Sequence, residues 1–151
     1  MELKAVQIAP YRKTYSWAVL VCFLAMAGSF FLVKQGYALF SVEAVITTTR
    51  YIFLVITLGA AFLYSPYQKR QKQKLAVLSD LDEKLAVYQT IFRSRMWFFT
   101  AWCLVCALSY YLTGRNMYFY FGLIDLLLMI TTFPSKLILR KELNEEDLII
   151  H

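Results

Sequence analysis

The chain has 151 residues, of which 60% are hydrophobic and 17% are charged, and its mean hydropathy is +0.52. Soluble domains carry about 25% charged residues, so this composition predicts a membrane protein and excludes an ordinary soluble domain. The net charge of +6 would suit a nucleic-acid interface. However, the Lys and Arg residues fall into blocks separated by apolar stretches, which is typical of membrane topology. We therefore expect no nucleic acid among the partners.

Four apolar segments approach the roughly 20 residues that a helix needs to cross a bilayer. They cover about residues 16–33, 44–64, 96–113 and 116–133. The third ends at Gly114, a typical helix cap, and the fourth stops before Pro134. The sequence predicts an all-α integral membrane protein, a four-helix bundle that forms a single membrane domain over residues 1–151.

The orientation follows from the positive residues that flank these spans. With both termini in the cytoplasm, all but three of the 16 Lys and Arg residues lie on the inner side, and the exceptions are Lys34, Arg50 and Arg115. Cytoplasmic flanks carry the excess of such residues, so we predict a multi-pass protein with cytoplasmic termini. The lack of glycosylation sequons and targeting signals favours a bacterial inner membrane. An alternative makes the first span a signal peptide that is cleaved near Ala25-Met26-Ala27.

The connection between the second and third spans, residues 66–95, carries a helical pattern. Ser65-Pro66-Tyr67-Gln68 is typical of a helix start, and Asp80 to Glu83 repeats that signal. Apolar residues recur every three or four positions, at Leu75, Leu78, Leu81, Leu85, Tyr88 and Phe92. We expect a cytoplasmic amphipathic hairpin that turns near Ser79-Asp80 and whose second arm continues into the third span.

Two charged segments adjoin the predicted inner membrane surface. A basic cluster at the base of the hairpin consists of Lys69, Arg70, Lys72 and Lys74. Such clusters fix orientation and attract anionic inner-leaflet lipids, and they can also bind a partner. The cytoplasmic tail, residues 135–151, is basic first and then acidic. We expect a short amphipathic helix there, lying on the hairpin or on a partner.

Asp125, at the centre of the fourth span, is the most informative side chain in the sequence. A carboxylate at this depth is costly unless it is paired, hydrated or neutral. Arg50 is its predicted partner, because we place the two roughly 9 Å and 13 Å below the outer ends of their helices. Thr47, Thr48 and Thr49 would complete a polar layer. This layer could relay protons or ions, or it could only fix helix register.

Cys103-Leu104-Val105-Cys106 is a CxxC motif on the third span. In a four-span chain this motif resembles the disulfide-oxidase and vitamin K epoxide reductase families, and that resemblance implies thiol oxidation linked to quinone. It covers this motif alone, and the second cysteine pair of those enzymes has no counterpart beyond Cys22. The alternative is that these are small packing residues, together with Ala107 on the third span and with Ala25, Gly28 and Ser29 on the first.

Other residues point to no defined reaction. His151 is the only histidine, and no phosphate-binding loop or nucleophile elbow occurs, so we predict no metal site, no cofactor and no catalytic residue. The run Tyr118 to Phe121 could line a lipid or quinone groove, or it could form an aromatic belt against lipid or a partner helix.

These observations lead to three hypotheses on function. The first is a non-enzymatic structural or accessory subunit of a membrane complex or homo-oligomer, with membrane protein subunits or further copies as partners. The second is a homo-oligomeric channel or transporter that uses Asp125 and Arg50. The third is a quinone-linked thiol redox enzyme that uses Cys103 and Cys106.

Overall fold

The structure is a computed structural model that describes residues 5–37, 43–143 and 149–150. This part of the chain contains five helices and one pair of very short strands. The helices are α1 (Ala9–Lys34), α2 (Glu43–Val77), α3 (Leu81–Thr113), α4 (Asn116–Thr131) and α5 (Lys136–Leu143). The strands β1 (Ala5–Val6) and β2 (Ile149–Ile150) are parallel, with Ala5 opposite Ile149. The all-helical prediction is confirmed for the described residues, apart from this two-residue pairing.

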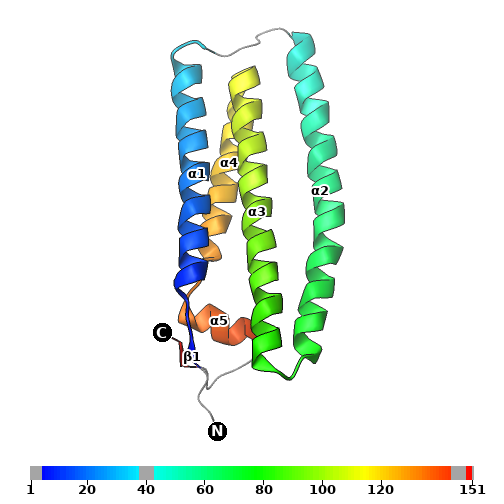
Figure 1. Ribbon diagram of the computed structural model, residues 1–151. Coiled ribbons are helices and arrows are strands. Elements are labelled where there is room, and N and C mark those ends of the chain that lie inside the picture. Colours follow the sequence, from blue (N-terminus) through cyan, green and yellow to red (C-terminus); the bar gives the residue numbers. More distant parts are fainter. Residues whose placement is uncertain (1–4, 38–42, 144–148, 151) are drawn as a thin grey trace.

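Helix α3 is the centre of the bundle, and it packs against each of the other four helices. Helices α1 and α4 lie against α3 and against each other, whereas α2 runs beside α3 on the other side (Figure 1). Helix α5 turns across the lower end of the bundle, where β1 also lies (Figure 1). The main hydrophobic core therefore forms between α1, α3, α4 and α5, with residues such as Met26, Met96 and Met129.

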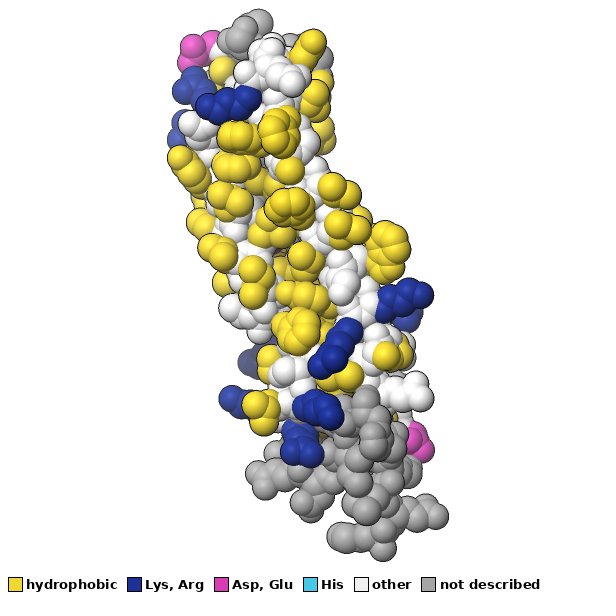
Figure 2. All heavy atoms as spheres, turned by 90° about the vertical axis from the view of Figure 1, so that its left-hand side faces the viewer, with side chains coloured by type: hydrophobic (Ala, Val, Ile, Leu, Met, Phe, Trp, Pro, Cys, Tyr) yellow, Lys and Arg dark blue, Asp and Glu magenta, His cyan; other side chains and the backbone are white. Residues whose placement is uncertain are grey.

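Helices α1, α2 and α3 are each long and apolar enough to cross a membrane. Helix α4 has 16 residues, about 24 Å at 1.5 Å per residue, which is shorter than a hydrocarbon core of roughly 30 Å. It meets α5 at a bend of 79°, and only this bent pair taken together would be a fourth candidate span. Figure 2 shows the resulting surface: a broad hydrophobic band, with Lys and Arg side chains above and below it.

The helix ends follow the sequence signals closely, with one exception. Gly114 caps α3 in the left-handed conformation, with φ of 65°, and its N–H donates to the Tyr110 carbonyl at 2.7 Å. The hairpin turn lies between Val77 and Leu81, with Asp80 at the N-cap of α3, and the second arm continues unbroken into the span. The prediction of a turn near Ser79-Asp80 is therefore confirmed.

The predicted helix start at Ser65-Pro66 is wrong, because α2 is continuous from Glu43 to Val77 and Pro66 lies inside it. Contacts with α3 on both sides of Pro66 explain this continuity. Tyr64 stacks on Phe98 with a centroid distance of 3.9 Å, and the Gln68 side-chain amide donates to the hydroxyls of Tyr64 and Ser94. The hydrogen bond that proline removes is offset by packing on both flanking turns.

The predicted amphipathic helix of the tail is confirmed as α5. Ser135 precedes it, and its hydroxyl accepts a hydrogen bond from the Ile138 N–H at 3.2 Å. Leu139 and Leu143 are buried against the bundle. The acidic part of the predicted tail, Glu145 to Asp147, lies outside the described residues.

The predicted close-packing surface is only partly correct. Ser29 and Ala107 are buried, but a Cβ built on Gly28 would meet no atom within 4 Å, so Gly28 is not at a close helix contact. The tight approach occurs at Gly122 of α4 instead. A Cβ there would lie 2.5 Å from Met26 Sδ and 3.3 Å from Cys106 Cβ. Gly122 therefore sets the spacing between α4 and its two neighbours.

Candidate functional site

Asp125 lies on the inward face of α4 and is only 5% exposed. Its Oδ2 atom is buried and accepts no hydrogen bond. A buried carboxylate oxygen without a donor is unfavourable, and such groups are rare outside functional sites. Asp125 is therefore the first candidate for a functional residue.

That space is a cavity of about 490 Å³ between α2, α3 and α4, within the range typical of small-molecule sites. We call it the Asp125 cavity. Its walls are predominantly apolar, and they include aromatic side chains from all three helices: Phe53, Phe98, Phe99, Trp102 and Phe121. Among these, Phe53 is buried and packs against Trp102 and Phe121, with centroid distances of 5.1 Å and 5.8 Å.

Arg50 lines the same cavity as Asp125, although the described residues include no ion pair between them. The structure thus brings the two predicted residues to one space without joining them. Arg50 also borders a second cavity nearer the first turn of α2, where Glu43, Arg115 and Tyr118 lie. Arg50 is exposed and borders both cavities.

The three threonines do not share the space around Asp125. Thr47 lines the second cavity, and the Thr48 hydroxyl donates to the Ala44 carbonyl of its own helix at 2.9 Å. Thr49 is half-buried. In contrast, Thr57 lines the Asp125 cavity, and its hydroxyl donates to the Phe53 carbonyl at 2.6 Å.

The Asp125 cavity opens to the outside of the bundle between α2 and α4. Residues on its border are substantially exposed, among them Leu54 of α2 at 46% and Leu128 of α4 at 51%. Helix α3 forms the floor opposite this opening. If this part of the bundle lies in a bilayer, the opening faces lipid rather than water.

Helical spacing is the sequence signal for this cavity, and single polar residues do not reveal it. Phe53, Leu54 and Thr57 follow Arg50 by three, four and seven positions, and all line the cavity. On α4, Phe121 and Leu128 flank Asp125 at the corresponding intervals. Of the aromatic run on α4, Tyr118 is buried, whereas Phe121 reaches the cavity.

The three cysteines lie in the interior and do not line the Asp125 cavity. Cys22, Cys103 and Cys106 are free thiols with no exposed surface. The Cys103 Sγ lies 3.8 Å from the Cys22 carbonyl of α1, and Cys106 lies at the Gly122 contact with α4. Their positions are those of small residues at helix contacts.

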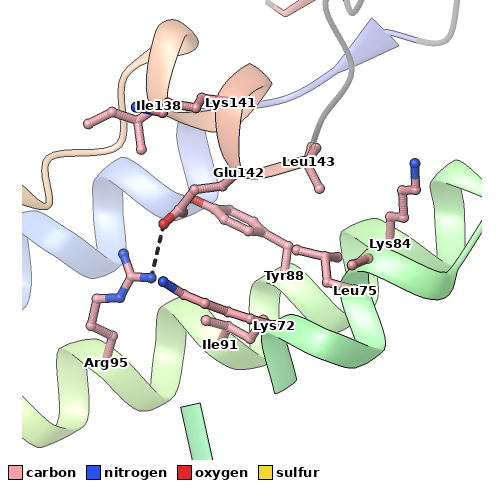
Figure 3. Close-up of a pocket in the computed structure, with 11 residues that line it drawn as sticks. Lys72, Leu75, Lys84, Tyr88, Ile91, Arg95, Ile138, Lys141, Glu142 and Leu143 are labelled. Atoms are coloured by element: carbon pink, nitrogen blue, oxygen red, sulfur yellow. Dashed lines mark hydrogen bonds and ion pairs between the residues drawn. The ribbon is translucent and has the colours of Figure 1, made fainter. Parts of the chain in front are cut away.

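A second site is formed at the lower end of the bundle, where α2, α3 and α5 meet around a cavity of about 560 Å³. Arg95 of α3 forms an ion pair with Glu142 of α5 at 3.0 Å (Figure 3). Tyr88 lies beside Glu142 (Figure 3), and burial, with a smaller contribution from Glu142, raises the pKa of its hydroxyl. The hydroxyl therefore stays protonated beside the carboxylate.

The predicted basic cluster adjoins this second site. Lys69, Arg70, Lys72 and Lys74 are all exposed on the last turns of α2. Lys72 also lines the cavity, together with Arg95 and Lys141 (Figure 3). The cluster is accessible to lipid headgroups or to a partner.

No family model, curated protein or solved structure matches this chain.

Proposed function

We propose that this protein is a non-enzymatic structural or accessory subunit of a bacterial inner-membrane complex or homo-oligomer. It crosses the membrane four times, with α4 as the fourth span and both termini in the cytoplasm. The hairpin arms and α5 project on the cytoplasmic side. Its partners are other membrane protein subunits or further copies of itself.

The topology is supported by the distribution of charge along the bundle. The strands β1 and β2, the turn between α2 and α3, and α5 all lie at one end (Figure 1). The same end carries the basic cluster of α2, Arg93 and Arg95 of α3, and Lys136 of α5. Cytoplasmic segments carry such an excess of positive residues. A reporter enzyme that works only in the cytoplasm should be active when it is fused after His151. A reporter that works only outside the cytoplasm should be inactive there, and its activity would contradict this orientation.

The observation that carries the subunit proposal is the sparse covering of α2. In the 18-residue apolar stretch of α2, only 6% of the residues are buried within the chain. Helix α3 is its main packing partner. Between membrane helices, stability comes from packing and polar contacts, because lipid tails solvate apolar side chains as well as protein does. A second protein surface against the outer face of α2 would supply that packing.

Native mass measurement of the chain, purified in mild detergent from its own membranes, tests this proposal. We expect a stoichiometric complex, either with a foreign subunit or with further copies. Single cysteine substitutions for crosslinking locate the interface. Val55→Cys lies on α2, where Val55 is 70% exposed, and Leu127→Cys on α4, where Leu127 is 63% exposed, is the matched control. Crosslinking from position 55 but not from 127 supports the proposal. A monomer without crosslinks contradicts it.

We further propose that the basic cluster binds anionic lipid of the inner leaflet. Each cation near such a surface contributes roughly 1 kcal/mol. Replacing Lys69, Arg70, Lys72 and Lys74 with Gln should reduce the anionic lipid that is retained in native mass spectra. Lys34→Gln is the control, because Lys34 ends α1 at the end of the bundle away from the basic cluster. It should leave the retained lipid unchanged.

The second candidate function is a homo-oligomeric channel or transporter, and the unpartnered Asp125 favours it. In that case Asp125→Asn abolishes proton- or ion-coupled flux in liposomes while the oligomer stays intact. If the chain is only a subunit, the same substitution weakens assembly or expression, and no flux is present to lose.

A further inference from the structure

We propose that the Asp125 cavity binds the headgroup of a neutral, membrane-soluble hydroquinone, with the hydrophobic tail leaving between α2 and α4. This site is separate from the proposed interface on the outer face of α2. It assigns to the chain a small-molecule ligand class that the subunit role does not require.

The charges at the cavity select a ligand without net charge. Asp125 disfavours an anion, whereas Arg50, on the same cavity, disfavours a cation. A neutral ligand with a hydrogen-bond donor and an acceptor satisfies both residues. The Oδ2 atom of Asp125, which is buried without a partner, accepts a hydrogen bond from the ligand's donor. The guanidinium group of Arg50 donates a hydrogen bond to the ligand's acceptor.

The walls select a flat ring. Phe53, Phe99, Trp102 and Phe121 present aromatic surfaces from three helices, and aromatic rings pack well on one another in offset or tilted arrangements. A hydroquinone combines such a ring with hydroxyl groups that both donate and accept. Its second hydroxyl oxygen accepts from Arg50 while the first hydroxyl donates to Asp125.

The opening selects a ligand that arrives from the bilayer. The exposed residues Leu54, Phe121 and Leu128 border the cavity, so the opening lies in the apolar band of the bundle. A ligand with an isoprenoid or alkyl tail can enter there while the tail stays in lipid. The thiols take no part in this binding, because none of the three cysteines lines the cavity.

Tryptophan fluorescence tests this proposal, because Trp102 lines the cavity and the chain has only two other tryptophans, Trp17 and Trp97. In the full-length chain with Trp17→Phe and Trp97→Phe, Trp102 is the only reporter. The probes are a decyl-substituted hydroquinone, kept reduced under argon, and its dimethyl ether, which cannot donate. We expect saturable quenching of Trp102 that is about tenfold tighter for the hydroquinone than for the ether.

Asp125→Asn should remove most of that preference, because the charged acceptor is lost while the side-chain shape is kept. Should this variant fail to fold, Phe121→Leu, on the partly exposed wall, should weaken both probes several-fold. Phe62→Ala is the control, since Phe62 is 80% exposed and does not line the cavity.

A reporter chain that retains only Trp97, which is 68% exposed, measures simple partitioning into the membrane. Equal, non-saturating quenching of Trp97 and Trp102 would overturn the proposal, as would equal binding of the hydroquinone and its ether. Tighter binding of tetraphenylphosphonium than of the hydroquinone would also overturn it, because the cavity would then select a cation. This readout does not depend on oligomeric state, so failure of the subunit proposal would leave it interpretable.

Discussion

Helices α2 and α3 are nearly equal in length, 35 and 33 residues, and both are apolar enough to span a membrane. Their environments differ greatly. In the 18-residue apolar stretch of α3, 39% of the residues are buried within the chain, whereas the share in α2 is 6%. The two helices thus have similar mean hydropathy, yet α3 is the centre of the fold and α2 lies at its edge.

The difference shows that hydropathy predicts a span but not its neighbours. Helix α3 carries small residues and aromatic residues that face three helices, such as Cys103, Ala107 and Tyr110. In the part of α2 whose burial is described, Phe53 and Leu75 are the buried residues. The edge position of α2 leaves room for the Asp125 cavity and for a partner surface. Variants of the two regions should therefore differ in their effect.

The largest effect is expected at the α4 contact with the centre of the bundle. Gly122→Leu should destabilise the protein by about 3 kcal/mol, because the added side chain would collide with Met26 and Cys106. Gly59→Leu in α2 is the control, since a Cβ there meets nothing within 4 Å. Unfolding in detergent measures both variants. An equal loss in the two would remove the distinction between centre and edge.

A smaller effect is expected where α2 meets the rest of the bundle. Phe53→Ala should cost about 1–2 kcal/mol, less than in a water-soluble core, because lipid tails can fill part of the space. Phe53 is 5% exposed, whereas Phe62 on the same helix is 80% exposed, so Phe62→Ala should have little effect. The same unfolding measurement compares them, and a neutral Phe53→Ala would show that α2 does not depend on this contact.

The next effect concerns α5, which covers the end of α3. Glu142→Gln should weaken its attachment by about 1 kcal/mol, because the carboxylate bonds to Arg95 at 3.0 Å in a partly buried setting. Hydrogen exchange over residues 136–143 should become faster. Lys136→Gln, at the exposed start of α5, should not change it. Unchanged exchange in both variants would mean that Leu139 and Leu143 hold α5 alone.

The smallest effect is expected for the thiols of α3. Cys103→Ser with Cys106→Ser should change stability by less than about 1 kcal/mol, since a serine hydroxyl in a helix can bond to the carbonyl one turn earlier. Stability in detergent and native mass are the readouts. Mass analysis of the unmodified chain after exposure to a benzoquinone should find all three cysteines still reduced. A disulfide between Cys103 and Cys106 would favour the redox hypothesis instead.

The helices themselves were largely predictable. Apolar length, the glycine at the end of α3 and the hairpin pattern placed the long helices close to their observed bounds. All six of the apolar positions predicted for the hairpin are buried or half-buried. The error at Pro66 arose because a local start signal was competing with packing on α3, which the sequence does not display.

The sequence by itself determined that this chain is helical and that its long helices are apolar enough to cross a membrane, because composition and apolar length depend on no contact between distant residues. It also placed Asp125 and Arg50 at similar depth. Only the tertiary structure decided that they share a cavity without pairing, and that Gly122 rather than Gly28 is the tight contact. Helix rotation and spacing decide such contacts, and these depend on how side chains from three helices fit together.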